Sequence, residues 1–287
     1  MYVCSGSLFF GELADEQTGI ISYRLLKAHF CRVRYCPICQ WRRSLFWRAR
    51  FYQVLPSILD DNPTARFIFL TLTVKNCDIF DLRDTLKMMS RAWGKFIKRK
   101  EFSSVIGWVR TTEVTRGKDN SAHPHFHCLL MVHSSYFSGR LYVKKDEWAK
   151  SWKSCMNVDY IPVVDVRAIK HKKKYVDVNT NENKTLLPKS ALFETLKYSV
   201  KIKDMTANPE WFIAMTEQTH RLRFIATGGL FKDILKKEET ITDEEMIHLG
   251  DDNPKLDFVR AVMCFLWRDD AMRYFLERTL SPDEAKL

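Results

Sequence analysis

The sequence lacks any long hydrophobic run. No apolar stretch approaches the roughly 18 residues that a membrane-spanning helix needs, and the chain shows neither an Arg-rich leader nor a small-residue cleavage site. These absences predict a cytoplasmic protein that does not span a membrane. Disulfide bonds are rare in a reducing compartment, so the eight cysteines need another explanation.

Acidic side chains are scarce over most of the chain. The formal net charge is +11, and residues 233–287 hold 8 Lys and Arg against 14 Asp and Glu, so residues 1–232 carry +17. A body this basic is typical of proteins that bind a polyanion, most often nucleic acid, although a basic solvated surface gives the same count. The 287 residues, 46% of them hydrophobic, suit one large domain with a small addition.

Three of the cysteines are close together in "CRVRYCPICQWRR", as Cys31, Cys36 and Cys39. A C-x-x-C pair with a third thiol nearby indicates a tetrahedral structural Zn²⁺ site, with packed free thiols as the alternative. Cys4 is the leading candidate for the fourth ligand, because the intervening sequence has the pattern of two strands and a turn that would bring it back. His29 is the other candidate. The basic, aromatic segment that follows has helical spacing, and it could track a phosphate backbone or cover the edge of a core.

Three histidines alternate in "HPHFHCLLMV", residues 123–132. Alternation is the period of a β-strand, so His123, His125 and His127 point to one face while Phe126 and the following apolar residues point to the other. Two imidazoles at positions i and i+2 can bind one divalent metal ion through their neutral nitrogens. Such a pair needs a third ligand from another segment.

A hairpin can supply that ligand. The extended segment "GWVRTTEVTR" (107–116) precedes the polar turn "GKDNSA", and the histidine strand follows directly. If the pairing is centred near Asp119, Glu113 lies opposite His125 and on the same face. A slip of one residue would turn Glu113 away. The sequence therefore predicts a site formed by Glu113, His125 and His127.

Strand and helix patterns alternate along the rest of the chain. We expect strands over 66–74 and 161–169, helices over 81–100 and 144–156, and a basic loop over 170–185 that is mobile or contacts DNA. After Pro188 the pattern predicts another helix, with Ser190 as a plausible N-cap.

This last helix carries a tyrosine in a reactive setting. Glu194 and Tyr198 are four residues apart and share a face, with Lys197 beside them. A tyrosine flanked by lysines, with a carboxylate one turn earlier, can act as an oxygen nucleophile toward a phosphate. A packing tyrosine is the alternative interpretation.

Together these motifs resemble the replication initiators of rolling-circle plasmids, members of the HUH endonuclease superfamily. "PHFH" is similar to the superfamily's two-histidine motif, "FLTLTV" to its first motif, and "ETLKYSVK" to a tyrosine motif with a glutamate four residues earlier. "FCRVRYCPICQWRR" and "HRLRFIATGGLFK" (220–232) also look like sequence around the catalytic core of one plasmid group. The resemblance covers residues 4–232, and His123 lies outside the two-histidine motif.

The resemblance implies a strand-specific nick at a plasmid's double-strand origin. Tyr198 would attack the scissile phosphate, leaving a 5′-phosphotyrosine and a free 3′-hydroxyl, assisted by Mg²⁺ or Mn²⁺ on Glu113, His125 and His127. Glu194 would act as the general base for water at termination, and Lys197 would stabilise the phenolate or hold a flanking phosphate. The implied partners are origin DNA, single-stranded or in a hairpin, and the host helicase and polymerase.

The implied fold is α+β, with a central antiparallel sheet that has the histidine strand in its middle and helices on its other face. We expect three parts: a zinc-binding segment and basic helix (1–60), a catalytic nickase core (61–232) and an acidic helical extension (233–287).

Rival functions remain open at this point. A transposase or a relaxase of the same superfamily would use the same chemistry. A histidine-triad nucleotide hydrolase also fits "HPHFHCLL", and a zinc-containing DNA-binding protein without catalysis fits the charge and the cysteines.

Overall fold

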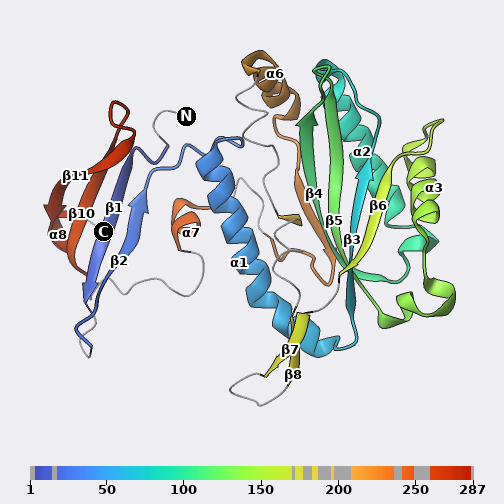
Figure 1. Cartoon of the computed structure of the whole chain (residues 1–287), viewed down its shortest axis with the longest axis horizontal. Helices are drawn as coiled ribbons and strands as arrows, with labels where there is room; N and C mark the ends of the chain where they lie inside the picture. Colours follow the sequence, from blue (N-terminus) through green and yellow to red (C-terminus); the bar gives the residue numbers. More distant parts are fainter. Residues whose placement is uncertain are drawn as a thin grey trace. The chain divides into compact units, whose positions relative to one another are not determined.

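The chain folds into two units, each with its own antiparallel sheet (Figure 1). The larger unit consists of residues 51–235, and the smaller unit consists of residues 1–50 together with 236–287. The computed structural model describes residues 4–14, 18–169, 172–176, 183–186, 195–196, 208–235, 241–248 and 259–285.

The histidine strand forms the centre of the larger unit. β5 (Ala122–Val132) pairs antiparallel with β3 (Arg66–Thr73) on one side and with β4 (Val105–Arg116) on the other. The sheet order is β6-β3-β5-β4-β9, so β5 is the middle strand, as predicted. The other elements of this unit are β6 (Val164–Ile169), β7 (Lys172–Val176), β8 (Asn183–Leu186), β9 (Ile225–Gly229), α2 (Leu82–Phe96), α3 (Lys145–Met156), α6 (Pro209–Thr219) and the short 3-10 turns η1 (Ile79–Asp81), η2 (Lys100–Phe102), η3 (Ser134–Phe137) and η4 (Gly139–Leu141).

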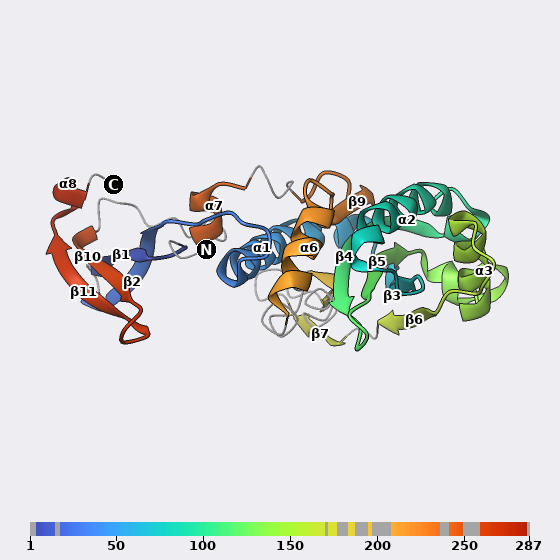
Figure 2. The ribbon, with the colours of Figure 1, turned by 90° about the horizontal axis from the view of Figure 1, so that it is seen from above.

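Helices α2 and α3 lie along the central sheet (Figure 2), and aromatic side chains join them to one of its faces. The ring of Phe126, from β5, lies 6.3 Å from the ring of Trp93 on α2 and 6.1 Å from that of Trp152 on α3. All three side chains are buried, and the indole N–H of Trp152 donates to the Thr73 carbonyl at 2.9 Å. Large aromatic rings in such contacts contribute much of the stability of a core. The predicted division of β5 into a core face and a histidine face is confirmed.

A buried arginine lies within this aromatic core. The guanidinium carbon of Arg110 is 4.2 Å from the centre of the Phe126 ring, and burial lowers the pKa of Arg110 to about 10. The side chain therefore keeps its charge at neutral pH. The electron-rich face of the ring offsets part of the cost of removing that charge from water.

The smaller unit joins the two ends of the chain in one sheet. Its strands are β1 (Ser7–Ala14), β2 (Ile21–Ala28), β10 (Val259–Arg268) and β11 (Arg273–Leu280), in the order β11-β10-β1-β2. Two short helices belong to it, α7 (Asp243–Ile247) and α8 (Pro282–Ala285). The long helix α1 (Pro37–Asp61) begins in the smaller unit and ends in the larger one.

The predicted helical extension over 233–287 is wrong. The longest described elements there are the strands β10 and β11, because β10 places apolar side chains such as Val262 and Cys264 in the buried layer beside β1. A high content of acidic residues does not by itself specify a helix. The predicted boundaries at 60 and 232 also differ from the structure, since residues 236–287 group with residues 1–50.

The basic segment 170–185 was predicted to be a loop, and this is wrong for part of it. β7 pairs antiparallel with β8 in a two-stranded sheet, while residues 170–171 and 177–182 lie outside the described part. The other predicted strands and helices that lie within the described residues match β3, β4, β6, α2 and α3, and the α+β class is confirmed. Among the described residues, no helix is long and apolar enough to cross a membrane.

Replacing Phe126 by alanine tests which face of β5 is buried. We expect Phe126→Ala to lower the free energy of unfolding by about 3–5 kcal/mol, because it leaves a cavity between α2, α3 and the sheet. The exposed Phe137 provides the matched control, and Phe137→Ala should cost less than about 1 kcal/mol. Urea unfolding followed by circular dichroism measures both. Equal small losses would mean that Phe126 faces solvent, which would move the histidines into the core.

Candidate functional site

The pairing of β4 with β5 places a carboxylate among the histidines. Glu113 lies directly opposite His125 in the register of the two strands, as the hairpin predicted. Glu113 Oε2 is 3.2 Å from His125 Nε2 and 2.7 Å from His127 Nε2. The Glu113 carboxylate is only 3% exposed, and both histidines are buried. The sheet thus holds one carboxylate and two imidazoles in a small, nearly dry space.

Neighbouring groups orient both imidazole rings. His125 Nδ1 lies 3.3 Å from the His123 carbonyl oxygen, to which an Nδ1–H donates, and His127 Nδ1 lies 3.4 Å from Thr71 Oγ1. The Phe69 ring packs against His127 with ring centres 5.5 Å apart. These contacts direct the Nε2 atom of each ring toward Glu113. Metal-binding histidines are commonly oriented in this way, by a hydrogen bond on the ring nitrogen that does not bind the metal.

The donor atoms of this cluster fit a divalent metal ion. The three ligand atoms of Glu113, His125 and His127 lie within 4.8 Å of one another, close enough to bind one ion. A divalent cation at this position would accept an electron pair from each of the three groups. The predicted residues are therefore brought together.

His123 is not part of this cluster. Its Nδ1 lies 2.6 Å from Asn76 Oδ1, so the ring is held by an amide at the end of the strand. Burial lowers the pKa of His123, the neighbouring His125 adds to this effect, and Glu113 opposes it. His123 therefore favours the neutral form more than an exposed histidine does.

The predicted nucleophile segment lies largely outside the described residues. Tyr198, Glu194 and Lys197 all fall there, and so does most of the helix predicted after Pro188. Thr195 and Leu196 are described, and both are buried. The Thr195 carbonyl oxygen accepts a hydrogen bond from Thr111 Oγ1 at 2.7 Å.

Thr111 connects that segment to the cluster. It lies opposite His127 in the strand register and two residues before Glu113, so all three side chains are on the same face. The hydrogen bond from Thr111 thus holds the backbone at Thr195 next to the histidine face. The sequence patterns did not identify Thr111 or Thr71. Both residues lie opposite His127 on the strands next to β5, and the period-2 alternation of those strands could have indicated them.

Four cysteines converge in the smaller unit. Cys4 precedes β1, Cys31 follows β2, and Cys36 and Cys39 stand just before and inside the first turn of α1. Their sulfur atoms lie within 4.8 Å of one another, and Cys4 Sγ is 3.5 Å from Cys39 Sγ. His29 is not in this group, so the geometry selects Cys4 as the fourth member.

The thiols differ in how readily they ionise. Burial raises the pKa of Cys4 to about 11 and also raises the pKa of Cys39. Burial acts in the same direction on Cys36, but hydrogen bonds from the Cys39 backbone and from the neighbouring thiols outweigh it and lower the pKa of Cys36. A bound divalent cation would favour the thiolate form of all four. The donor set fits a tetrahedral metal site.

Side chains from α1 hold the loop between the cysteines. The Arg43 guanidinium donates to the Arg32 carbonyl at 2.7 Å and to the Arg34 carbonyl at 3.4 Å, and Arg43 is buried. Gln40 donates to the Tyr35 carbonyl at 3.3 Å. These bonds fix the backbone that presents Cys31 and Cys36. The sequence alone would allow every arginine of this helix to contact DNA. Arg43 instead has a structural role.

Comparison with known proteins identifies similar chains. Residues 22–275 match a family model described as "Replication protein". A "Protein rep" from Lentilactobacillus hilgardii is 35% identical over 272 residues, covering 92% of this chain and 83% of the relative. A "Protein rep" from Streptococcus pneumoniae serotype 2 is 33% identical, covering 89% and 78%. A "Replication protein" from Staphylococcus aureus is 35% identical, covering 78% and 96%. No solved structure matches the chain.

Divalent metal binding tests the histidine cluster. We expect His127→Ala and Glu113→Ala to weaken Mn²⁺ binding by ~100-fold, because each removes a ligand, and Thr71→Val to weaken it by ~10-fold, because it removes only a neighbour that orients His127. His123→Ala should change the affinity less than either ligand variant. Electron paramagnetic resonance titration of free Mn²⁺ measures each affinity. A larger loss for His123→Ala than for Glu113→Ala would contradict this ligand set.

Metal analysis tests the cysteine cluster. The purified protein should contain about one Zn²⁺ per chain, and Cys36→Ser should lose it during dialysis, because a structural zinc site needs all four ligands. The buried Cys155 lies outside the cluster, so Cys155→Ser should retain the metal. Inductively coupled plasma mass spectrometry gives the stoichiometry. Equal zinc content in the two variants would rule out the cysteine site.

Proposed function

This chain belongs to the Replication protein family, and from that premise we propose that it initiates rolling-circle replication of a plasmid by nicking one DNA strand at the double-strand origin. The resemblance of the sequence to replication initiators is confirmed by the family match. The nick itself, its tyrosine mechanism and the HUH fold are the proposal.

One observation carries this proposal. The Thr195 carbonyl is hydrogen-bonded to Thr111, on the face that holds Glu113, His125 and His127. Consecutive Cα atoms are about 3.8 Å apart, so the Cα atom of Tyr198 is at most ~11 Å from that of Thr195. This connection of Thr195 to the histidine face supports a nucleophile that is close to Thr195 in the sequence, as Tyr198 is.

The cluster residues would hold Mn²⁺ or Mg²⁺. When bound, such an ion polarises the scissile phosphate and stabilises the charge that develops on its oxygens. Thr71 and the His123 carbonyl keep the two ligating rings in place. The buried setting of Glu113 and both histidines excludes water from the ligand side of the phosphate.

Tyr198 acts as the nucleophile in this proposal. Its phenolic oxygen forms a bond to phosphorus and the bond from phosphorus to the 3′ oxygen breaks. The phenol loses its proton, and the leaving 3′ oxygen takes up a proton. The products are a 5′-phosphotyrosine and a 3′-hydroxyl that can prime a polymerase. Lys197 either stabilises the phenolate or holds a neighbouring phosphate.

Glu194 acts at termination. A phenol has a reference pKa of about 10, so a carboxylate with a reference value of about 4.3 is a poor base for it. The same carboxylate, four residues before the tyrosine in the sequence, would orient and deprotonate water for attack on the phosphotyrosine bond. Release of the protein then needs no second tyrosine.

The charge distribution supports DNA as the substrate. The larger unit has 30 Lys and Arg against 19 Asp and Glu, whereas the smaller unit has 16 of each. The whole net charge of +11 therefore belongs to the unit that carries the histidine cluster. Origin DNA, unpaired or in a hairpin, is the proposed substrate, with the host helicase and polymerase acting after the nick. Zn²⁺ on the four cysteines would stabilise the smaller unit.

The family match favours this function over the rivals. A histidine-triad hydrolase uses three histidines, but His123 is held by Asn76, and within the described part of the chain the group around Glu113 contains the two histidines His125 and His127. A relaxase or a transposase would share the chemistry, and the family is described by replication. A zinc protein without catalysis leaves the buried Glu113 cluster unexplained.

Separate measurement of cleavage and hydrolysis tests the two proposed roles. Tyr198→Phe should abolish nicking and covalent capture of DNA while DNA binding changes little, because only the phenolic oxygen is lost. Glu194→Gln should still form the covalent adduct, while its hydrolysis slows by ~10²-fold, since a general base has been removed. Single-turnover kinetics on an origin oligonucleotide follow adduct formation and decay separately.

Tyr142→Phe is the matched control, because Tyr142 is exposed and lies outside the strands that carry the cluster residues. It should leave both steps unchanged. A 5′-linked adduct formed by Tyr198→Phe would overturn the nucleophile assignment. Equal slowing of both steps by Glu194→Gln would leave that residue with a structural role.

A further inference from the structure

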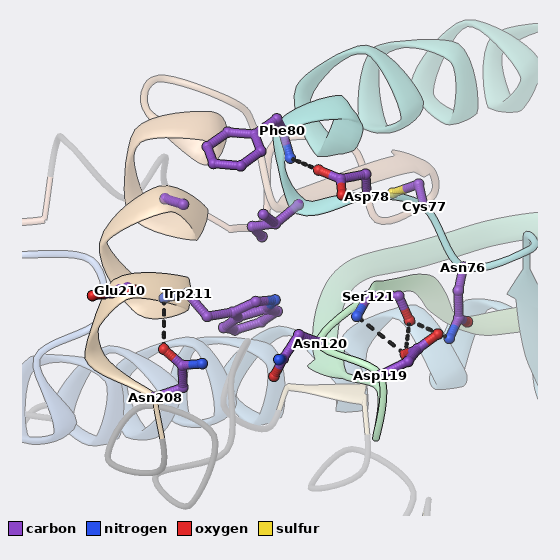
Figure 3. Close-up of a pocket in the computed structure, with 12 residues that line it drawn as sticks. Asn76, Cys77, Asp78, Phe80, Asp119, Asn120, Ser121, Asn208, Glu210 and Trp211 are labelled. Carbon is purple, nitrogen blue, oxygen red and sulfur yellow. Dashed lines mark hydrogen bonds between the residues drawn. The ribbon is translucent and has the colours of Figure 1, made fainter.

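A cavity of about 480 Å³ opens beside the β4–β5 turn, outside the histidine cluster (Figure 3). Three segments of the larger unit form its walls. They are the stretch after β3 (76–80), the hairpin turn (119–121) and the start of α6 with the residue before it (208–214). The chemistry proposed above uses none of these side chains.

Asn76 connects this cavity to the row of histidines. Its Oδ1 contacts His123 Nδ1 at 2.6 Å, and its Nδ2 donates to Ser121 Oγ at 2.8 Å. The His123 and His125 rings are 5.3 Å apart between centres. His125 and Ser121 are separated by four residues of nearly extended chain, roughly 13 Å. A few nucleotides of single-stranded DNA can bridge that distance.

The charge of the described walls disfavours a phosphate. Among the described residues no lysine or arginine lines the cavity, and three carboxylates do, those of Asp78, Asp119 and Glu210. These carboxylates do not form a metal site either. The two groups of potential metal ligands found among the described residues are the four cysteines and the Glu113 cluster. The walls therefore suit a neutral ligand that donates hydrogen bonds.

Two carboxylates keep an acceptor atom for such a ligand. Asp78 Oδ1 accepts from the Phe80 N–H at 2.9 Å, and Asp119 Oδ1 accepts from the Ser121 N–H and hydroxyl at 3.1 and 2.5 Å. Within the described residues, Oδ2 of each carboxylate has no hydrogen bond. Local bonds thus fix the direction of the carboxylates and leave one oxygen of each for a donor.

Two aromatic side chains add a flat surface and a donor. The ring of Phe80 is 71% exposed although it is large and apolar, whereas Trp211 is only 4% exposed. Within the described residues the buried Nε1–H of Trp211 has no hydrogen-bond partner. Figure 3 shows the indole of Trp211 directed from α6 toward the hairpin turn. A buried donor without a partner is destabilising, and a ligand acceptor in the cavity would satisfy it.

We propose that this cavity binds one unpaired base of the DNA strand, and that it prefers bases with an exocyclic amino group to thymine. Phe80 stacks on the base, the carboxylate oxygens accept from its amino group, and the Trp211 N–H donates to a ring nitrogen or carbonyl. The phosphates stay outside, near the basic surface. The proposal rests on the proposed function, because it assumes that single-stranded DNA reaches the histidine cluster.

Equilibrium binding of single-stranded DNA tests this proposal without cleavage. The probes are fluorescein-labelled oligo(dC), oligo(dT) and an abasic strand of equal length, and the protein is full-length Tyr198→Phe. Fluorescence anisotropy should show oligo(dC) bound about 10-fold more tightly than oligo(dT), the effect of one good hydrogen-bonded base contact. Because these homopolymers contain no origin sequence and binding is measured without cleavage, failure of the proposed nucleophile would leave the binding result unchanged.

Variants in the cavity separate stacking from hydrogen bonding. Phe80→Ala should weaken binding of oligo(dC) and oligo(dT) by about 10-fold and leave the abasic strand unaffected, because stacking needs a base. Asp78→Asn together with Asp119→Asn keeps each Oδ1 but replaces the free acceptor oxygen by an amide donor, so it should remove the preference for oligo(dC) while affinity for oligo(dT) does not fall. Tyr142→Ala, which removes an exposed aromatic ring elsewhere in the larger unit, is the matched control and should change nothing.

Two results would overturn the proposal. One is equal affinity of the Phe80→Ala and parent proteins for oligo(dC). The other is equal weakening of all three strands, including the abasic one, which would mean that Phe80 acts through the backbone or the fold. Because Phe80 is exposed, the variant should keep its circular dichroism spectrum and melting temperature, which excludes unfolding as the cause.

Discussion

The register between β4 and β5 is the constraint on which the site depends. It places Glu113 opposite His125, and a shift by one residue would turn Glu113 toward Phe126 and the helices. The hairpin turn sets this register. Asp119 accepts two hydrogen bonds from Ser121, and Asn120 has a left-handed φ of 65°. Gly117 is required there, because a Cβ atom would lie 2.5 Å from Asp119 Oδ1. The polar turn of residues 117–121 thus determines the geometry of the buried cluster of Glu113, His125 and His127.

The two faces of the central sheet have different roles. One packs against the helices, and the other holds the histidine cluster. On one face, Trp93, Trp152 and Phe126 form a rigid aromatic layer. On the other, buried polar groups must keep a fixed geometry although they gain little from packing. Because interior packing resists small displacements, the aromatic layer fixes β5 from the face opposite to the histidines. A strand that is fixed on its apolar face can present imidazoles on the other with little freedom, which is what a preorganised metal site requires.

The smaller unit is assembled from the two ends of the chain. β1 pairs with β2, its neighbour in sequence, and also with β10, which lies about 250 residues further along. The cysteine cluster lies at the junction of β1, β2 and α1, and α1 continues from there into the larger unit. A metal ion bound there would therefore stabilise the start of the helix that both units share. In the proposed function the cysteines therefore have a structural role, and the basic larger unit binds the DNA.

Local patterns in the sequence determined much of this protein. Alternation identified the histidine strand and its hairpin partner, and the C-x-x-C spacing with Cys31 identified the cysteine cluster. These predictions succeeded because each depends on residues that are close in sequence or joined by one short turn. The tertiary structure alone decided the rest. It chose Cys4 over His29, placed Thr111 beside Thr195, and paired β10 with β1 where a helix had been expected. Contacts between distant segments depend on which apolar faces pack against each other. Short-range periodicity shows that a face is apolar, but it does not specify the element that packs against it.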